Sequence, residues 1–194
     1  MRRRDAQARR TGPVAGMTPI RERPAEALGR GQPGHWEGDL IMGAGHVSAI
    51  VTLVERTTRY TLLGHLPGAR RDSAAVRDVV VAALGALPPH LRRTLTWDQG
   101  AEMARHAEVA AALGSTPVFF CDPHSPWQRP TNENTNGLLR AYFPKSTDLS
   151  VHTPEEIADV QAGLNDRPRR VLGWDSPAER LATLLRSPPS VLRR

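Results

Sequence analysis

The sequence predicts an α/β domain in which helices flank a mixed five-stranded sheet. Three observations support this prediction: short runs typical of strands, stretches with helical apolar periodicity between the later strands, and a length of 194 residues, enough for one hydrophobic core. We expect the core at residues 35–186, between a flexible basic arm at 1–34 and a basic tail at 187–194. The arm has scattered prolines and little apolar periodicity, so burial would not offset the entropy cost of ordering it.

The first part of the core is expected to be an antiparallel meander with short turns. Its three strands are predicted at residues 36–42, 47–55 and 60–66. A helix follows, from a cap at Asp72 or Ser73 to about Leu87, because apolar residues recur on one of its faces.

The second part of the core alternates strands and helices. A fourth strand is predicted at 94–97 and a fifth at 117–121, with a helix between them that begins at Gly100 and ends at Gly114. The remaining helices are expected at about 132–142, 154–165 and 177–186. Three strands followed by alternating helices and strands are typical of the ribonuclease-H-like fold.

Composition favours a polyanionic partner. The formal net charge of +6 comes almost wholly from arginine, since Lys145 is the only lysine. Nucleic acid is one such partner, and a base-composition bias that inflates Arg, Ala, Gly and Pro together is the alternative explanation. The single cysteine, Cys121, excludes an internal disulfide framework, and the sequence has neither a long apolar run nor a secretory signal. We therefore expect a cytoplasmic protein with no membrane partner.

Three acidic residues, Asp39, Asp98 and Glu133, lie where the predicted fold would bring them together. The centre of the first strand is expected beside the end of the fourth, and Glu133 near the start of a later helix. Converging carboxylates repel one another unless cations lie between them, and oxygen ligands favour Mg²⁺ or Mn²⁺ over Zn²⁺. Two such ions about 3.5–4 Å apart can activate an attacking oxygen and stabilise the leaving oxygen of a phosphoryl displacement. For any one of these residues, the alternative is a turn former or a helix cap.

Two further patterns involve Glu37 and the pair Cys121 and His124. Glu37 shares a strand face with Asp39 by the period of two, which allows a supporting role, but we expect a surface acid. Cys121 and His124 have a spacing that zinc sites use, yet the sequence offers no second pair, so we expect no zinc there.

Six ordered motifs carry a more specific signal. They are PGHWEGDLI at 33–41, TLVERTTRY at 52–60, TWDQG at 96–100, FCDPHSPWQR at 120–129, NENTNGLLR at 132–140 and LNDRPRRVLGW at 164–174. With these motifs the chain resembles the catalytic half of bacterial insertion-sequence-thirty family transposases, from about residue 17 to about 185. That family belongs to the integrase catalytic-core branch of the DDE superfamily, named for two aspartates and a glutamate.

The resemblance implies that Asp39, Asp98 and Glu133 are the catalytic, metal-binding triad. It implies two Mg²⁺ ions, with Mn²⁺ as a substitute, and a reaction that frees a 3′-hydroxyl at a transposon end and transfers it to target DNA. The implied partners are DNA, as transposon ends and target, and further copies of the chain, at least a dimer during synapsis. The implied location is the nucleoid of the bacterial cytoplasm.

Several polar residues around Glu133 are candidates for DNA contacts. Asn136 and Arg140 follow Glu133 on the same helix face, so Arg140 can meet a phosphate near the metals. The alternative roles are helix capping by asparagine and simple solvation of the charged side chains. The candidates are Asn132, Asn134, Asn136, Arg140, Lys145, His124 and Arg129.

The chain departs from the family pattern at Pro130 and Ser146, where members usually carry glycine. Pro130 fixes φ and removes an amide donor just before Glu133. Residues 1–34 hold no segment that could form the helix-turn-helix found upstream in the family, so end recognition is expected to be lost or supplied by another chain. A truncated, inactive DNA-binding remnant is therefore one alternative, and a hydrolytic nuclease of the same fold is another.

Overall fold

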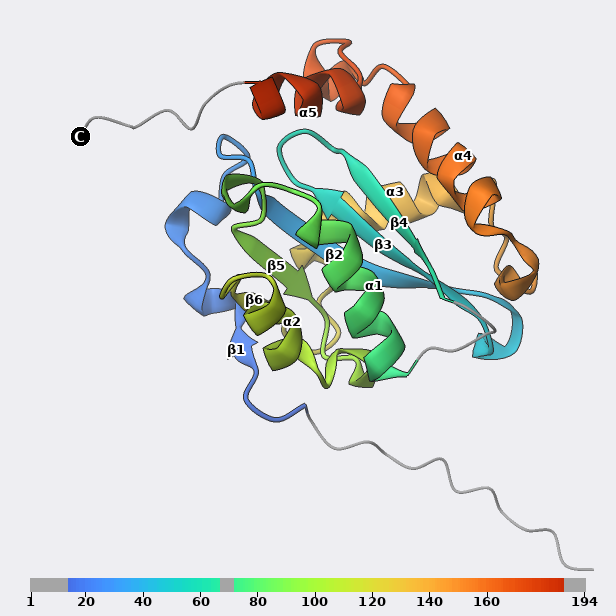
Figure 1. The fold of residues 1–194 in the computed structure, drawn as a ribbon, viewed down its shortest axis with the longest axis horizontal. Coiled ribbons are helices and arrows are strands. Elements are labelled where there is room, and N and C mark those ends of the chain that lie inside the picture. Colours follow the sequence, from blue (N-terminus) through green and yellow to red (C-terminus); the bar gives the residue numbers. More distant parts are fainter. Residues whose placement is uncertain (1–13, 67–71, 187–194) are drawn as a thin grey trace, which may run out of the picture.

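A six-stranded mixed sheet forms the centre of the molecule (Figure 1). The computed structural model describes residues 14–66 and 72–186. In sequence order the strands are β1 (Thr18–Pro19), β2 (His35–Met42), β3 (Ala49–Glu55), β4 (Thr61–His65), β5 (Thr94–Trp97) and β6 (Val118–Phe120). In space the order is β1-β6-β5-β2-β3-β4, with β2, β3 and β4 antiparallel and β2, β5, β6 and β1 parallel. The five predicted strands are all present, and β1 is an addition.

Helices cover both faces of the sheet (Figure 1). They are α1 (Ser73–Gly85), α2 (His106–Ala112), α3 (Pro130–Leu139), α4 (Pro154–Asp166) and α5 (Pro177–Arg186). As predicted, Asp72 caps α1, because its carboxylate accepts the N–H groups of Ala74 and Ala75 at 3.1 and 2.9 Å. The single helix expected from Gly100 is instead split into a 3₁₀ turn at Ala101–Met103 and the shorter α2.

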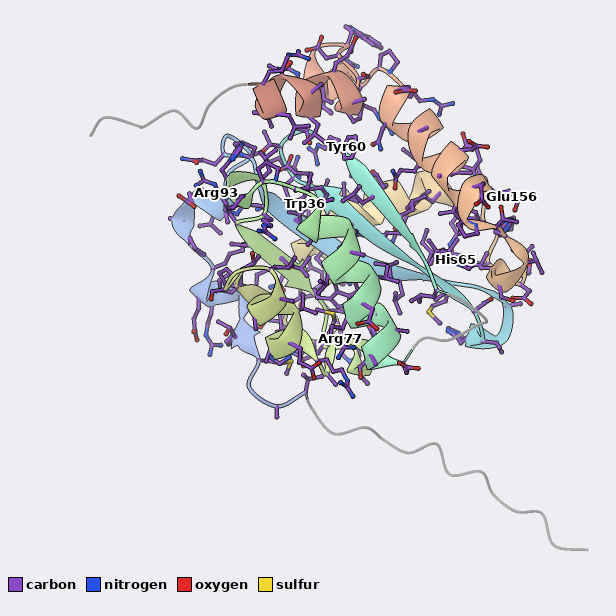
Figure 2. All side chains as sticks on the ribbon, viewed as in Figure 1. Trp36, Tyr60, His65, Arg77, Arg93 and Glu156 are labelled. Carbon is purple, nitrogen blue, oxygen red and sulfur yellow. The ribbon has the colours of Figure 1, made fainter. Side chains whose placement is uncertain are left out.

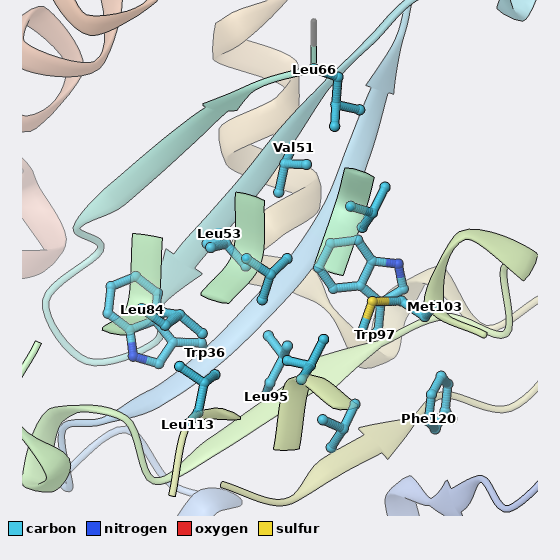
Figure 3. Packing of buried hydrophobic residues seen from close by; sticks show 14 of the residues in the cluster. Trp36, Val51, Leu53, Leu66, Leu84, Leu95, Trp97, Met103, Leu113 and Phe120 are labelled. Atoms are coloured by element: carbon cyan, nitrogen blue, oxygen red, sulfur yellow. The ribbon is translucent and has the colours of Figure 1, made fainter. Parts of the chain in front are cut away.

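Two apolar clusters fill the space on either side of the sheet. The larger cluster packs the sheet against α1 and α2 and includes the fully buried Trp36 and Trp97 (Figure 3). The smaller cluster packs the other face against α3 and α4 through residues such as Ile50, Leu139 and Ile157. The sheet is thus covered on both faces, as in the predicted ribonuclease-H-like fold.

The segment before β2 belongs to the folded unit, which corrects the prediction of a flexible arm for residues 14–34. β1 extends the sheet by pairing with β6, and Ala27 is fully buried. Arg23 is buried as well and donates a hydrogen bond to Thr96 at 3.1 Å, while Arg56 donates to the carbonyl of Ala27. These partners lie far away in sequence, so local periodicity does not reveal them. The predicted arm residues 1–13 and the predicted tail 187–194 lie outside the described residues.

No helix within residues 14–66 and 72–186 is long and apolar enough to cross a membrane.

Candidate active site

Two of the predicted acidic residues, Asp39 and Asp98, face a common cation. The parallel pairing of β2 with β5 runs to Glu37 opposite Thr96, so Asp39 and Asp98 follow on neighbouring strands. The guanidinium of Arg129 lies between them: Nη1 is 3.3 Å from Asp39 Oδ1, and Nη2 is 3.2 Å from Asp98 Oδ2. The structure therefore brings these two carboxylates together at the end of β5, as the strand order predicted.

Arg129 is anchored in this position. Its Nη1 also donates to the carbonyl of Gly38 at 2.6 Å, and its side chain is only 10% exposed. Burial lowers the pKa of Arg129, but Asp39 and Asp98 outweigh this effect and raise it. We expected Arg129 to contact DNA, whereas in this structure its charge is used to hold two aspartates.

The two aspartates have further partners that fix their orientation. Asp39 Oδ1 accepts the N–H of Leu40 at 2.9 Å, and Asp39 Oδ2 accepts a hydrogen bond from Asn136 at 3.0 Å. Asp98 Oδ1 accepts the N–H of Gly100 at 3.0 Å. Burial raises the pKa of Asp39, Arg129 opposes this shift, and the nearby Asp98 adds to it. A partly buried carboxylate of this kind is stabilised by a cation that replaces its lost hydration.

Glu133 does not complete the group in this structure. It lies exposed in the first turn of α3, and within the described ranges no set of three or more His, Cys, Asp or Glu side chains is arranged to hold a metal ion. Asn136, one turn further along α3, does reach Asp39. Since residues three apart share a helix face, Glu133 projects from the side of α3 that faces the aspartates.

Glu37 fixes the start of α3, which corrects our expectation of a surface acid. Its carboxylate is fully buried and accepts the N–H groups of both Thr131 and Asn132, each at 2.9 Å. The other oxygen accepts Arg56 Nε at 2.9 Å in a buried ion pair. The residue at the N-cap of α3, Arg129, makes no side-chain capping bond. Glu37 therefore takes over that role from strand β2 and ties the helix that carries Glu133 to the strand that carries Asp39.

The other predicted DNA contacts have different surroundings. Asn132 is fully buried and donates to the carbonyl of Glu37 at 3.0 Å, so it is not available to DNA. Arg140 donates to the carbonyls of Met42 and Phe143 at 2.9 and 3.2 Å. Asn134, His124 and Lys145 are exposed.

Pro130 is the first residue of α3. In the first turn an amide has no partner within the helix, so proline at this position costs no helical hydrogen bond. The departure from glycine is therefore compatible with the helix that carries Glu133.

Sequence reasoning did not identify Glu102, a third carboxylate near the pair. Its Oε1 accepts the indole N–H of the buried Trp97 at 3.1 Å. Burial raises the pKa of Glu102, and the charges of Asp98 and Asp39 raise it further. Glu102 lies four residues after Asp98, and only its position in the fold distinguishes it from an ordinary acidic residue of a helix.

A cavity of about 380 Å³ opens beside Asp98. It is lined by the loop after β6, including Cys121 and His124, and by Gln99 and Gly100. Burial raises the pKa of the Cys121 thiol to about 11, so this side chain lines the cavity as a neutral thiol. Asp98 and Arg129 both line this cavity, so this side of the acidic pair is open to the surface.

The sequence profile described as the integrase core domain matches residues 29–126. The chain is 54% identical over 179 residues to the transposase for insertion sequence element IS1086 of Cupriavidus metallidurans, with 92% of this chain and 52% of that protein covered. It is 48% identical over 166 residues to transposase InsI for insertion sequence element IS30A of Escherichia coli, with 86% and 42% covered. The chain thus spans about half the length of the curated relatives it matches.

A solved structure shares the fold. The simian T-cell lymphotropic virus intasome in complex with PP2A regulatory subunit B56 gamma, determined by cryo-EM, contains a chain that matches with a TM-score of 0.61. The match covers 82% of this chain and 56% of that one at 16% sequence identity.

Proposed function

Because the chain belongs to the integrase core domain family, we propose that it is the catalytic part of an insertion-sequence transposase, which cleaves DNA and joins the freed 3′-hydroxyl to target DNA. The observation that supports this most directly is the pair Asp39 and Asp98, two carboxylates from neighbouring strands that share one cation. We assign the catalytic unit to residues 35–186, with residues 14–34 packed against it.

The donor set suits magnesium. Asp39 and Asp98 offer oxygen ligands only, and both already require a positive charge, here supplied by Arg129. Glu133 would be the third ligand, from the flank of α3 that faces them. When bound, two magnesium ions, or manganese in their place, supply the charge that activates the attacking oxygen and stabilises the leaving oxygen. Asn136 orients Asp39, and Glu37 fixes the helix from which Glu133 would approach.

We also propose that the substrates are the transposon ends and the target DNA, and that at least two copies of the chain act together in the bacterial nucleoid. The net charge of +6 supports a polyanionic substrate. The matched relatives are named as transposases of insertion sequences, which supports transposition.

Cleavage of duplex DNA in Mg²⁺ or Mn²⁺ tests the proposal. Asp39→Asn, Asp98→Asn and Glu133→Gln should each reduce cleavage by roughly 100-fold or more, since even partners one shell further from a metal contribute about 10–100-fold. Asp159→Asn, an exposed residue of α4, is the matched control and should cleave normally. Cleavage that survives all three substitutions would exclude the proposed site. Cleavage without joined products would indicate a hydrolytic nuclease, and binding without cleavage would indicate an inactive remnant.

A further inference from the structure

A second hollow, lined by two arginines together with neutral polar and apolar side chains, lies on the opposite flank of α3. It has a volume of about 140 Å³, and its lining includes Arg59, Arg169, Thr131 and Asn134. The buried face of α3, which includes Asn132 and Leu139, separates two flanks of the helix. One flank carries Asn136, which bonds to Asp39, and Glu133 three residues before it; the other flank, with Thr131 and Asn134, lines this hollow.

The two arginines face the hollow without a counter-ion. Among the described residues, neither Arg59 nor Arg169 forms an ion pair with a carboxylate. Arg59 Nη1 donates to Thr131 Oγ1 at 2.7 Å, and Arg169 Nη2 donates to the carbonyl of Leu164 at 3.1 Å. The Nε of Arg169 is buried and has no hydrogen-bond partner. Buried donors of this kind normally have an acceptor, and an anionic oxygen is a suitable one.

The charges around Arg59 and Arg169 also favour a bound anion. Burial lowers the pKa of Arg59 and the charge of Arg30 lowers it further, while the charges of Glu37 and Glu55 offset part of the effect. Burial also lowers the pKa of Arg169, and Arg167 adds to that shift. A bound anion would relieve both the desolvation and the repulsion.

The turn that presents Arg59 is rigid. The fully buried Glu55 accepts the N–H of Thr57 at 2.9 Å, the N–H of Thr58 at 2.6 Å and the N–H of Gly34 at 3.0 Å. Arg59 is therefore held in place before any ligand arrives, which lowers the entropy cost of binding.

We propose that Arg59 and Arg169 bind a backbone phosphate of DNA on the flank of α3 opposite Asp39. Guanidinium groups suit phosphate oxygens, and two of them line this hollow, with the neutral polar groups of Thr131 and Asn134 and no carboxylate. The two arginines belong to the 52–60 and 164–174 segments, and their hydrogen bonds go to Thr131 and Leu164 and not to Asp39 or Asp98. DNA lying across the exposed side of α3 would thus be held on one flank and cleaved on the other, so this inference rests on the proposed function.

Binding of a short fluorescein-labelled DNA duplex, measured by anisotropy with EDTA present over a range of salt concentrations, tests the inference. Arg59→Gln and Arg169→Gln should each weaken binding roughly tenfold, whatever the duplex sequence. Each should also reduce the slope of log affinity against log salt by about 1, the value for one lost phosphate contact. Arg169→Lys should keep the wild-type slope because it keeps the charge.

Arg77→Gln is the matched control. Arg77 is paired with Asp78 and Glu108 on the α1 side of the sheet, and Figure 2 shows it at the opposite end of the molecule from Tyr60, the neighbour of Arg59. Its substitution should leave both affinity and slope unchanged. Should Arg59→Gln fail to fold because of its bond to Thr131, Arg169→Gln decides the question alone.

The outcomes separate this inference from the proposed function. Wild-type affinity and slope in both glutamine variants, together with normal Mg²⁺-dependent cleavage, would overturn the inference alone. A wild-type chain that neither binds nor cleaves DNA would overturn both. Inorganic phosphate that raises the melting temperature of the wild type but not of Arg169→Gln, with unchanged duplex affinity, would show a free-anion site and overturn the DNA assignment.

Discussion

Replacing Glu37 with alanine should destabilise the fold far more than a surface substitution does. The carboxylate is fully buried and joins three segments of the chain, β2, the end of β3 and the start of α3. It accepts hydrogen bonds from Arg56, which directly follows β3, and from the backbone N–H groups of Thr131 and Asn132 in α3. Alanine would leave the guanidinium and both N–H groups without their acceptor.

The expected loss follows from these contacts. Removing one partner of a buried ion pair costs about 3–5 kcal/mol, because the remaining charge is buried and unpaired, and the side chain of Arg56 is only 7% exposed. Loss of the helix cap adds about 1 kcal/mol. We therefore expect about 4–6 kcal/mol. In a domain of this size each kcal/mol lowers the melting temperature by about 2–4 °C, so the drop is on the order of 10–20 °C. Glu37→Gln should fall between alanine and the wild type, since its amide oxygen still accepts from α3.

Calorimetry and urea titration measure this loss, and hydrogen exchange locates it. Asp159→Ala, on the exposed face of α4, is the control and should change the free energy of unfolding by less than about 0.5 kcal/mol. In Glu37→Ala the amides of the first turn of α3 should exchange faster relative to those of α1. A melting temperature within a few degrees of the wild type, with unchanged protection of α3, would refute the capping role.

Three further predictions concern the surroundings of the site. Gly38→Ala should lower the free energy of unfolding, measured by urea titration, by about 1–3 kcal/mol, because the new Cβ would lie 2.1 Å from Trp97 Cζ3. The control Gly163→Ala, whose Cβ would have nothing within 4 Å, should be neutral or stabilising, and equal effects of the two substitutions would contradict this packing. Burial lowers the pKa of His35 from its ordinary 6.5 to about 4, so the unfolded chain binds its proton first and stability is lost as pH falls through this window, by up to about 3 kcal/mol. His35→Gln should flatten the plot of unfolding free energy against pH between those values, and an unchanged slope would count against a neutral buried histidine. Without metal, Arg129→Gln should have a lower melting temperature than the wild type, because the two aspartates lack their guanidinium partner. Added Mg²⁺ should raise the melting temperature of this variant more than that of the wild type, and an equal rise in both proteins would show that Arg129 does not occupy the cation position.

Local sequence patterns were sufficient for the central strands and insufficient for the edge of the sheet. The strand at 94–97 was predicted with the bounds that the structure shows, because apolar residues there are bounded by clear turn signals. β1 has only two residues and shows no periodicity of its own. It exists through its pairing with β6, and the burial of Arg23 depends on Thr96, 73 residues away. Contacts of this range leave no local trace in one sequence.

The difference between local patterns and long-range contacts also explains which residues of the site were predicted correctly. The strand order was enough to place Asp39 beside Asp98, and the period of two correctly placed Glu37 on the face of Asp39. The partners of Glu37, however, are backbone amides 94 and 95 residues away, and an amide has no signature in the sequence. Arg129, in the loop before the helix of Glu133, was predicted to contact DNA, but its neighbours in space are the two aspartates.

The attachment of α3 constrains how a metal-binding state can form. Glu37 and the buried Asn132 fasten the start of the helix to β2, so the helix backbone is fixed next to Asp39. With a fixed helix, this structure would differ from a three-carboxylate site only in the positions of two side chains, those of Arg129 and Glu133. If only these side chains exchange places, loosening α3 by Glu37→Ala should weaken Mn²⁺ binding, measured by electron paramagnetic resonance at a temperature where the variant is folded. If the whole helix had to shift, the same substitution should strengthen Mn²⁺ binding, and that result would refute a fixed helix.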